Sequence, residues 1–87
     1  MIALEITMPI ASDWPTRDEL GGRNAVELAL IAAAVGQCTG AGGGMRQMHL
    51  SYRVNHESDV PAARAAIDKA MKEHMPGFQF EVTAHYE

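Results

Sequence analysis

The chain has 87 residues, of which 47% are hydrophobic and 21% are charged. A chain of this length builds one hydrophobic core, so we expect a single domain over residues 1–87, and the apolar content excludes a disordered chain. The formal net charge of −4, with seven scattered lysines and arginines, excludes the basic patch that a nucleic-acid partner requires.

The single cysteine rules out an internal disulfide and is typical of a reducing compartment. The amino-terminal residues lack the basic start and apolar core of a signal peptide. The longest apolar run, residues 28–36, is about half as long as a membrane span. We therefore expect a cytoplasmic protein without a membrane contact and without a nucleic-acid partner.

Residues 2–8 alternate between apolar and polar with a period of two, which predicts a half-buried strand that ends at Pro9. A helix is predicted to follow, because Thr16 and Glu19 match the capping-box pattern of a helix start. We expect this helix to run to about Val35, with Gly36 as the left-handed residue that closes it.

The predicted first helix carries two apolar stripes. At 100° per residue, one stripe is the expected core face, and its residues are Leu20, Leu28, Ile31 and Val35. The second stripe, on roughly the opposite side, contains Val26, Leu30 and Ala33. With Trp14, the second stripe is apolar surface that a small core leaves over, so we predict an interface there with a second copy or another protein. Contact with the second helix is the alternative.

Residues 36–44 contain five of the eight glycines. A phosphate-binding loop lies between a strand and a following helix, whereas this segment follows a helix and precedes a strand, so that function is excluded. We predict instead that residues 37–42 form a glycine-rich edge strand, which turns through the glycines into a strand over residues 45–54.

A second helix is predicted to begin at Ser58 or Asp59, with Pro61 in its first turn, and residues 78–87 alternate as a last strand. The alternating strands predict an antiparallel sheet with both helices on one face. The order is β-α-β-β-α-β, so the predicted class is an α+β, ferredoxin-like sandwich.

A charged helix start, spaced glycines and an aspartate before the second helix recur in this chain as Arg17, Asp18, Glu19, Gly36, Gly40, Gly42, Gly44 and Asp59. Through these residues the chain resembles, over almost its whole length, a set of small uncharacterised bacterial proteins. The resemblance implies a ferredoxin-like fold and a regulatory or protein-binding role, and it brings no activity with it.

The remaining polar residues suggest two kinds of chemistry, a metal site on the open sheet face and a reactive thiol at Cys38. The open sheet face is predicted to carry Glu5, His49, Arg53, Glu81 and His85. A metal ion requires three or four donors at about 2 Å, whereas the two histidines are expected on strands about 10 Å apart, so we predict no metal and no cofactor. Cys38 follows a helix end that disfavours a thiolate, which indicates a small packed side chain.

These patterns contain no Ser, His and Asp set and no pair of carboxylates at a catalytic spacing. We therefore expect a binding or regulatory module without catalytic activity, which acts through protein contacts and forms a homodimer. The alternative is a small-molecule-binding or metal-binding protein, or a small enzyme, with its site on the open sheet face or at the glycine-rich segment.

Overall fold

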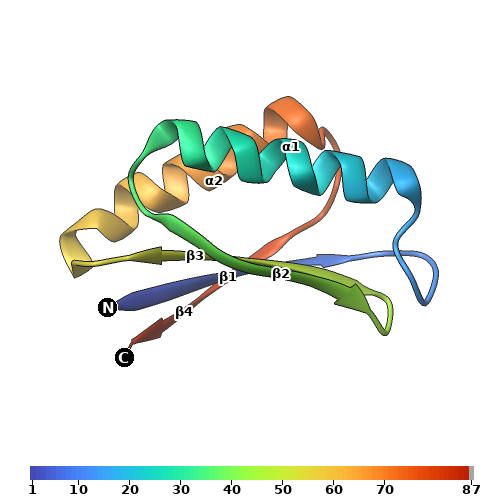
Figure 1. The fold of residues 1–87 in the computed structure, drawn as a ribbon, viewed down its shortest axis with the longest axis horizontal. Coiled ribbons are helices and arrows are strands. Elements are labelled where there is room, and N and C mark those ends of the chain that lie inside the picture. The colour runs from blue at the N-terminus through green and yellow to red at the C-terminus, as the bar shows by residue number, and fades with distance from the viewer. Residues whose placement is uncertain (87) are drawn as a thin grey trace.

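The computed structural model describes residues 1–86. Both helices lie on one face of a sheet, and the other face of the sheet is open (Figure 1). The elements in chain order are β1 (Ile2–Pro9), α1 (Arg17–Ala33), β2 (Gln37–Gly44), β3 (Gln47–Val54), α2 (Val60–His74) and β4 (Glu81–Tyr86), with a 3-10 turn at Glu57–Asp59. The predicted order of strands and helices is confirmed.

The sheet has the strand order β2-β3-β1-β4, and each neighbouring pair is antiparallel. With two helices packed on one face, this is the ferredoxin-like α+β fold that the sequence predicts. The alternation of period two identified the inner faces of the two central strands correctly. The buried residues on those faces are Ile2, Leu4, Ile6 and Met8 in β1 and Met48, Leu50, Tyr52 and Val54 in β3.

The glycine-rich segment forms the predicted edge strand, but β2 continues through the glycines to Gly44. The turn into β3 is made by Met45 and Arg46, whose φ angles are 52° and 65°. This is the left-handed geometry of a two-residue hairpin. The prediction that the glycines make the turn is therefore wrong. The turn residue Arg46 is fixed by the loop after β1: the N–H of Arg46 donates to Asp13 O at 3.4 Å, and the carbonyl of Arg46 accepts from Ile10 N at 2.9 Å.

The capping box at the start of α1 is present. Thr16 Oγ1 accepts a hydrogen bond from Glu19 N at 3.2 Å, and Glu19 Oε1 accepts one from Thr16 N at 2.8 Å. At the other end, the left-handed residue is Ala34, with a φ of 56°, rather than the predicted Gly36. The helix therefore closes two residues earlier than glycine preference alone suggests.

Gly36 is required by close packing instead of by its φ angle. A Cβ atom added to it would lie 2.4 Å from the backbone oxygen of Arg53 on β3. Its N–H also donates to the hydroxyl of Tyr52 at 2.7 Å. The segment between α1 and β2 thus passes so near β3 that no side chain fits there.

The large side chains of α1 are buried on the face opposite to the predicted one, although Val35, just after the helix, packs against the core as predicted. Val26 and Leu30, predicted to be spare apolar surface, are fully buried, whereas Leu28 is 61% exposed and Ile31 is 55% exposed. Ala33, at the last position of the helix, is exposed. Val26 and Leu30 therefore belong to the core and cannot present a surface to a partner in this fold.

Small residues explain which face of α1 is buried. Gly22 lies on the buried side, where an added Cβ would be 3.0 Å from Cγ of Met75, just after α2. Ala29 also packs against the core. Because these small side chains let α1 approach its neighbours closely, the narrower stripe packs better than the bulkier one. Asn24, at the centre of the predicted core stripe, is accordingly exposed.

Helix α2 buries one face, which consists of Val60, Ala63, Ile67, Ala70 and Met71. Pro61 lies in the first turn, as predicted. His74, at the last position of the helix, is exposed. The last strand begins at Glu81 rather than at Phe78, and Phe78 packs against the core from the segment before it.

Candidate functional site

The residues predicted as a ligand site all lie on the strands of the sheet: Glu5 on β1, His49 and Arg53 on β3, and Glu81 and His85 on β4. The strand register separates them into rows. Thr7 lies between His49 and Glu81, and Ala3 lies between Arg53 and His85. Glu5 occupies a middle row, where its Oε1 accepts a hydrogen bond from Ser51 Oγ at 2.6 Å. The fold thus brings the five side chains to one face but not to one point.

The two histidines are farther apart than predicted. Their rows are those of Thr7 and Ala3, so the separation has about 13 Å along the strands and about 10 Å across them, or roughly 16 Å in all. Within residues 1–86, no three side chains of His, Cys, Asp or Glu are grouped so that they could hold a metal ion. The open face offers scattered polar groups that suit hydration or weak ion pairing.

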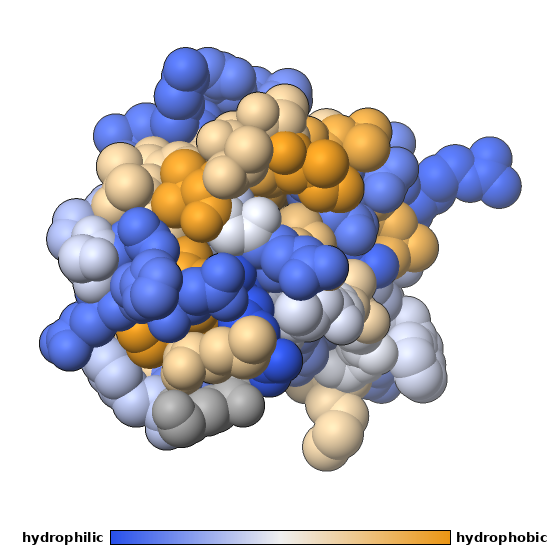
Figure 2. All heavy atoms as spheres, turned by 60° about the vertical axis from the view of Figure 1, so that its left-hand side comes forward, coloured by the Kyte–Doolittle hydropathy of each residue, from blue (hydrophilic) through white to orange (hydrophobic). Residues whose placement is uncertain are grey.

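The outer face of α1 exposes large apolar side chains. Its large exposed side chains are Leu20, Leu28 and Ile31, and the polar residue among them is Asn24. Figure 2 shows hydrophobic surface gathered over the helical layer of the molecule. The outer side of α2 is different, since it is charged and includes an ion pair of 2.9 Å between Lys72 Nζ and Asp68 Oδ2. The apolar side chains therefore gather on one helix.

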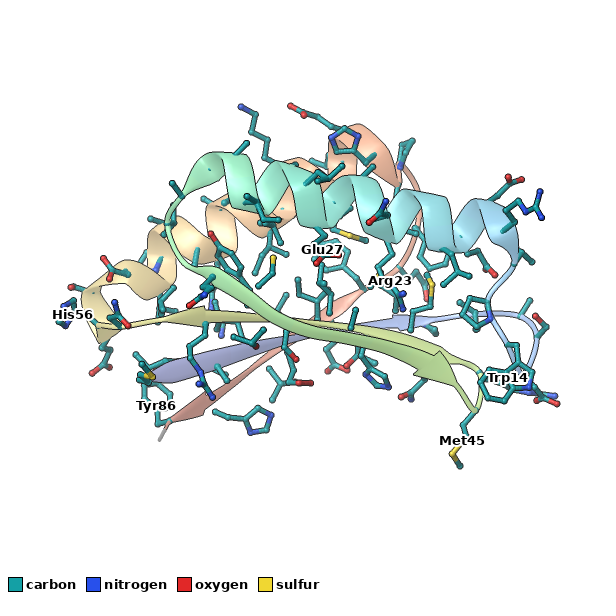
Figure 3. The ribbon with its side chains drawn as sticks, viewed as in Figure 1. Trp14, Arg23, Glu27, Met45, His56 and Tyr86 are labelled. Carbon is teal, nitrogen blue, oxygen red and sulfur yellow. The ribbon has the colours of Figure 1, made fainter. Side chains whose placement is uncertain are left out.

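Two charged residues lie on the flank of α1 that overhangs β2, and both side chains leave the helix on the side of that strand (Figure 3). Arg23 Nη1 donates a hydrogen bond to the backbone oxygen of Gly42 at 2.6 Å. Glu27 lies near Cys38, whose Sγ is 3.9 Å from the backbone oxygen of Glu27. Within residues 1–86, the carboxylate of Glu27 has no ion-pair partner.

The environment of Cys38 keeps its thiol protonated. Burial raises the pKa of Cys38, and the negative charge of the Glu27 carboxylate raises it further. A thiol acts as a nucleophile only as the thiolate. Cys38 is thus a partly buried packing group beside Glu27.

The group predicted as an interface does not assemble. Trp14 is 71% exposed, and its ring covers Gly44, with Cζ3 at 3.0 Å from where a Cβ would be. It lies beside Met45 at the tip of the β2–β3 hairpin (Figure 3). Because Val26 and Leu30 are in the core, Trp14 has no apolar stripe of theirs to join.

A hollow of about 220 Å³ lies between the start of α1 and the end of α2, with Gly22, Met75 and Phe78 in its lining. Ligand pockets generally have volumes of about 300 Å³ or more. The hollow is therefore small for a metabolite. The outer face and the flank of α1 remain the most distinctive surfaces.

Sequence reasoning missed the residues that make these surfaces. The periodicity of the helix predicts Leu20, Leu28 and Ile31 in the core, and it predicts no role for Arg23 or Glu27. The available signal was Asn24, a polar side chain in the middle of the supposed core stripe.

No family model, curated protein or solved structure matches this chain. The fold implied by the resemblance to small bacterial proteins is present, whereas membership of such a family stays a prediction. Among residues 1–86, no helix has the length and apolarity needed to cross a membrane.

Proposed function

We propose that this protein is a non-catalytic binding or regulatory module that acts through protein contacts made by the outer face of α1. The observation that carries the proposal is the exposure of Leu20, Leu28 and Ile31 on one helix face. Full burial of such a side chain contributes about 1.5 to 3 kcal/mol, so covering these partly exposed ones would contribute about 3 kcal/mol to binding. Apolar patches on small domains commonly mark contact sites.

The alternative, a small-molecule or metal site or a small enzyme, has weaker support. The polar side chains of the open face stand in separate rows, and the thiol of Cys38 is held protonated. The proposal also includes kinship with the small bacterial ferredoxin-like proteins that the chain resembles through Arg17, Asp18 and Glu19 and through its glycine-rich segment.

Photo-crosslinking in cells tests the proposal. A photoreactive phenylalanine analogue in place of Leu28 should yield a covalent protein adduct on irradiation, because a partner covers that position. The same analogue in place of Lys69, on the exposed side of α2, is the matched control and should yield none. Addition of Ile31→Arg should abolish the adduct at position 28, since a charge would replace apolar contact area.

Equal adduct formation at positions 28 and 69 would contradict the proposal, because nonspecific encounters alone would explain the product. The absence of any adduct at position 28 would contradict it as well. Far-UV circular dichroism of the purified variants verifies that each one is folded.

A further inference from the structure

The flank of α1 above β2 has a sequence pattern that is the same in both directions. Its residues are Leu20, Arg23, Glu27 and Ile31, which lie within an arc of about 80° at 100° per residue. Read from either end, the order is apolar, charged, charged, apolar, and the two charges have opposite signs. The midpoint of Arg23 and Glu27 lies at Ala25, and that of Leu20 and Ile31 lies half a residue further on, between Ala25 and Val26.

Such a pattern is self-complementary for two antiparallel copies of the helix. A two-fold axis through the midpoint places Leu20 against the partner's Ile31 and Arg23 against the partner's Glu27, and it repeats both contacts in the opposite direction. This is the arrangement of an isologous interface, in which one surface patch pairs with itself. A parallel arrangement of the helices would place like charges together.

The edge strand beneath the flank is centred at the same place. Arg23 bonds to Gly42 O, and the backbone oxygen of Glu27 lies near Cys38 Sγ, so the middle of β2 lies beneath the midpoint of α1. A Cβ added to Gly40 or Gly42 would meet no atom within 4 Å, and neither residue has a positive φ. Within residues 1–86, neither a close contact nor a positive φ requires these glycines, and they leave the strand beside the flank without side chains.

The carbonyl of Gly42 on the edge strand already accepts a hydrogen bond from Arg23. We therefore expect α1 to make most of the contact with a partner and the edge strand to lie at the border of that contact. We infer that the partner of this surface is a second copy of the chain, docked with its α1 antiparallel to the first about the midpoint of the helix. This inference rests on the proposed function and names its partner. The charge pairs set the register, and the leucine and isoleucine contacts supply the apolar area.

The size of the contact predicts a weak dimer. Helix α1 is about 25 Å long and presents a flank about 10 Å wide, so two copies bury roughly 500 to 600 Å² between the helices. Stable interfaces bury about 1,200 Å² or more, so we expect a weak, transient dimer. The monomer and dimer would then exchange as the concentration changes.

Charge reversal tests the arrangement. Sedimentation equilibrium from about 10 µM to 1 mM should show a monomer–dimer equilibrium for the natural chain. Either Arg23→Glu or Glu27→Arg alone gives both facing pairs like charges and should weaken dimerisation by about tenfold or more. The double variant R23E/E27R should restore it, and an equimolar mixture of the two single variants should associate about as tightly as the natural chain, because each mixed pair then joins opposite charges.

Arg64→Glu, a charge reversal on the exposed side of α2, is the matched control and should leave dimerisation unchanged. A strict monomer at 1 mM would overturn the inference, and so would a dimer that both single reversals leave intact. A crosslink from position 28 to a different protein, together with a monomeric natural chain, would support the proposed function while refuting this partner. Circular dichroism separates a loss of folding from a loss of contact.

Discussion

The hydroxyl group of Tyr52 links the end of α1 to the sheet. Tyr52 is fully buried on β3. Its hydroxyl donates to Leu30 O at 3.1 Å in the last turns of α1 and accepts from Gly36 N at 2.7 Å just before β2. One oxygen atom therefore joins β3, the end of α1 and the start of the edge strand.

The substitution Tyr52→Phe removes this oxygen and keeps the ring. Leu30 O retains the N–H of Ala34 at 3.3 Å, but Gly36 N loses its bond to the hydroxyl. An unsatisfied buried group costs about 1 to 3 kcal/mol, so we expect about 2 kcal/mol less stability. For a domain of this size, that loss lowers the Tm by about 8 to 16 °C.

Thermal and urea unfolding followed by far-UV circular dichroism measures the change, since Trp14 is too exposed to report on the core. Tyr86→Phe is the control, because Tyr86 is an exposed tyrosine on β4 and should change the free energy of unfolding by less than about 0.5 kcal/mol. If Tyr52→Phe were as stable as the natural chain, the hydroxyl would not connect these elements in solution.

Gly36→Ala should destabilise the protein by more than about 2 kcal/mol in the same assay, because its Cβ would collide with Arg53 O; equal stability would show that the backbone shifts freely there. Thr16→Ala should cost about 1 kcal/mol through loss of the helix cap, and Thr16→Ser should restore it. The thiol of Cys38 should react with iodoacetamide more slowly at pH 7.5 than a free cysteine, and the rate should rise as the pH approaches its raised pKa. Glu27→Gln should speed that reaction by removing a negative charge, and an unchanged rate would mean that burial alone raises the pKa.

The strands were predictable because one sheet face is buried and the other is not. Alternation in β1 and β3 therefore identifies both the element and its inner face. The start of α1 was predictable for a similarly local reason, since the capping box uses residues only three apart.

The faces of α1 were not predictable from periodicity, because the helix has two apolar stripes and the choice between them depends on tertiary packing. Gly22 and Ala29 let the helix come close to its neighbours on the side of Val26 and Leu30, and no local pattern measures that closeness. Asn24 was the local sign against the predicted core face, because an unpaired amide is costly in a core.

The open sheet face was predicted to carry its polar residues, and it does, but their separation depends on strand register. The sequence does not contain that register directly: His49 aligns with Thr7, and His85 aligns with Ala3. A ligand set inferred from a shared face therefore needs the alignment of strands as well as their orientation.

The position of β1 has a consequence for how the chain becomes folded during synthesis. This strand precedes both of its partners in the chain, yet it lies in the middle of the sheet, where Ile2 pairs with Val54 on one side and with Tyr86 on the other. One of its hydrogen-bonding edges can pair once β3 has been made, whereas the other stays unpaired until β4 has been made. Long-range pairings of this kind form more slowly than local helical contacts, so the second edge is open to aggregation during that interval.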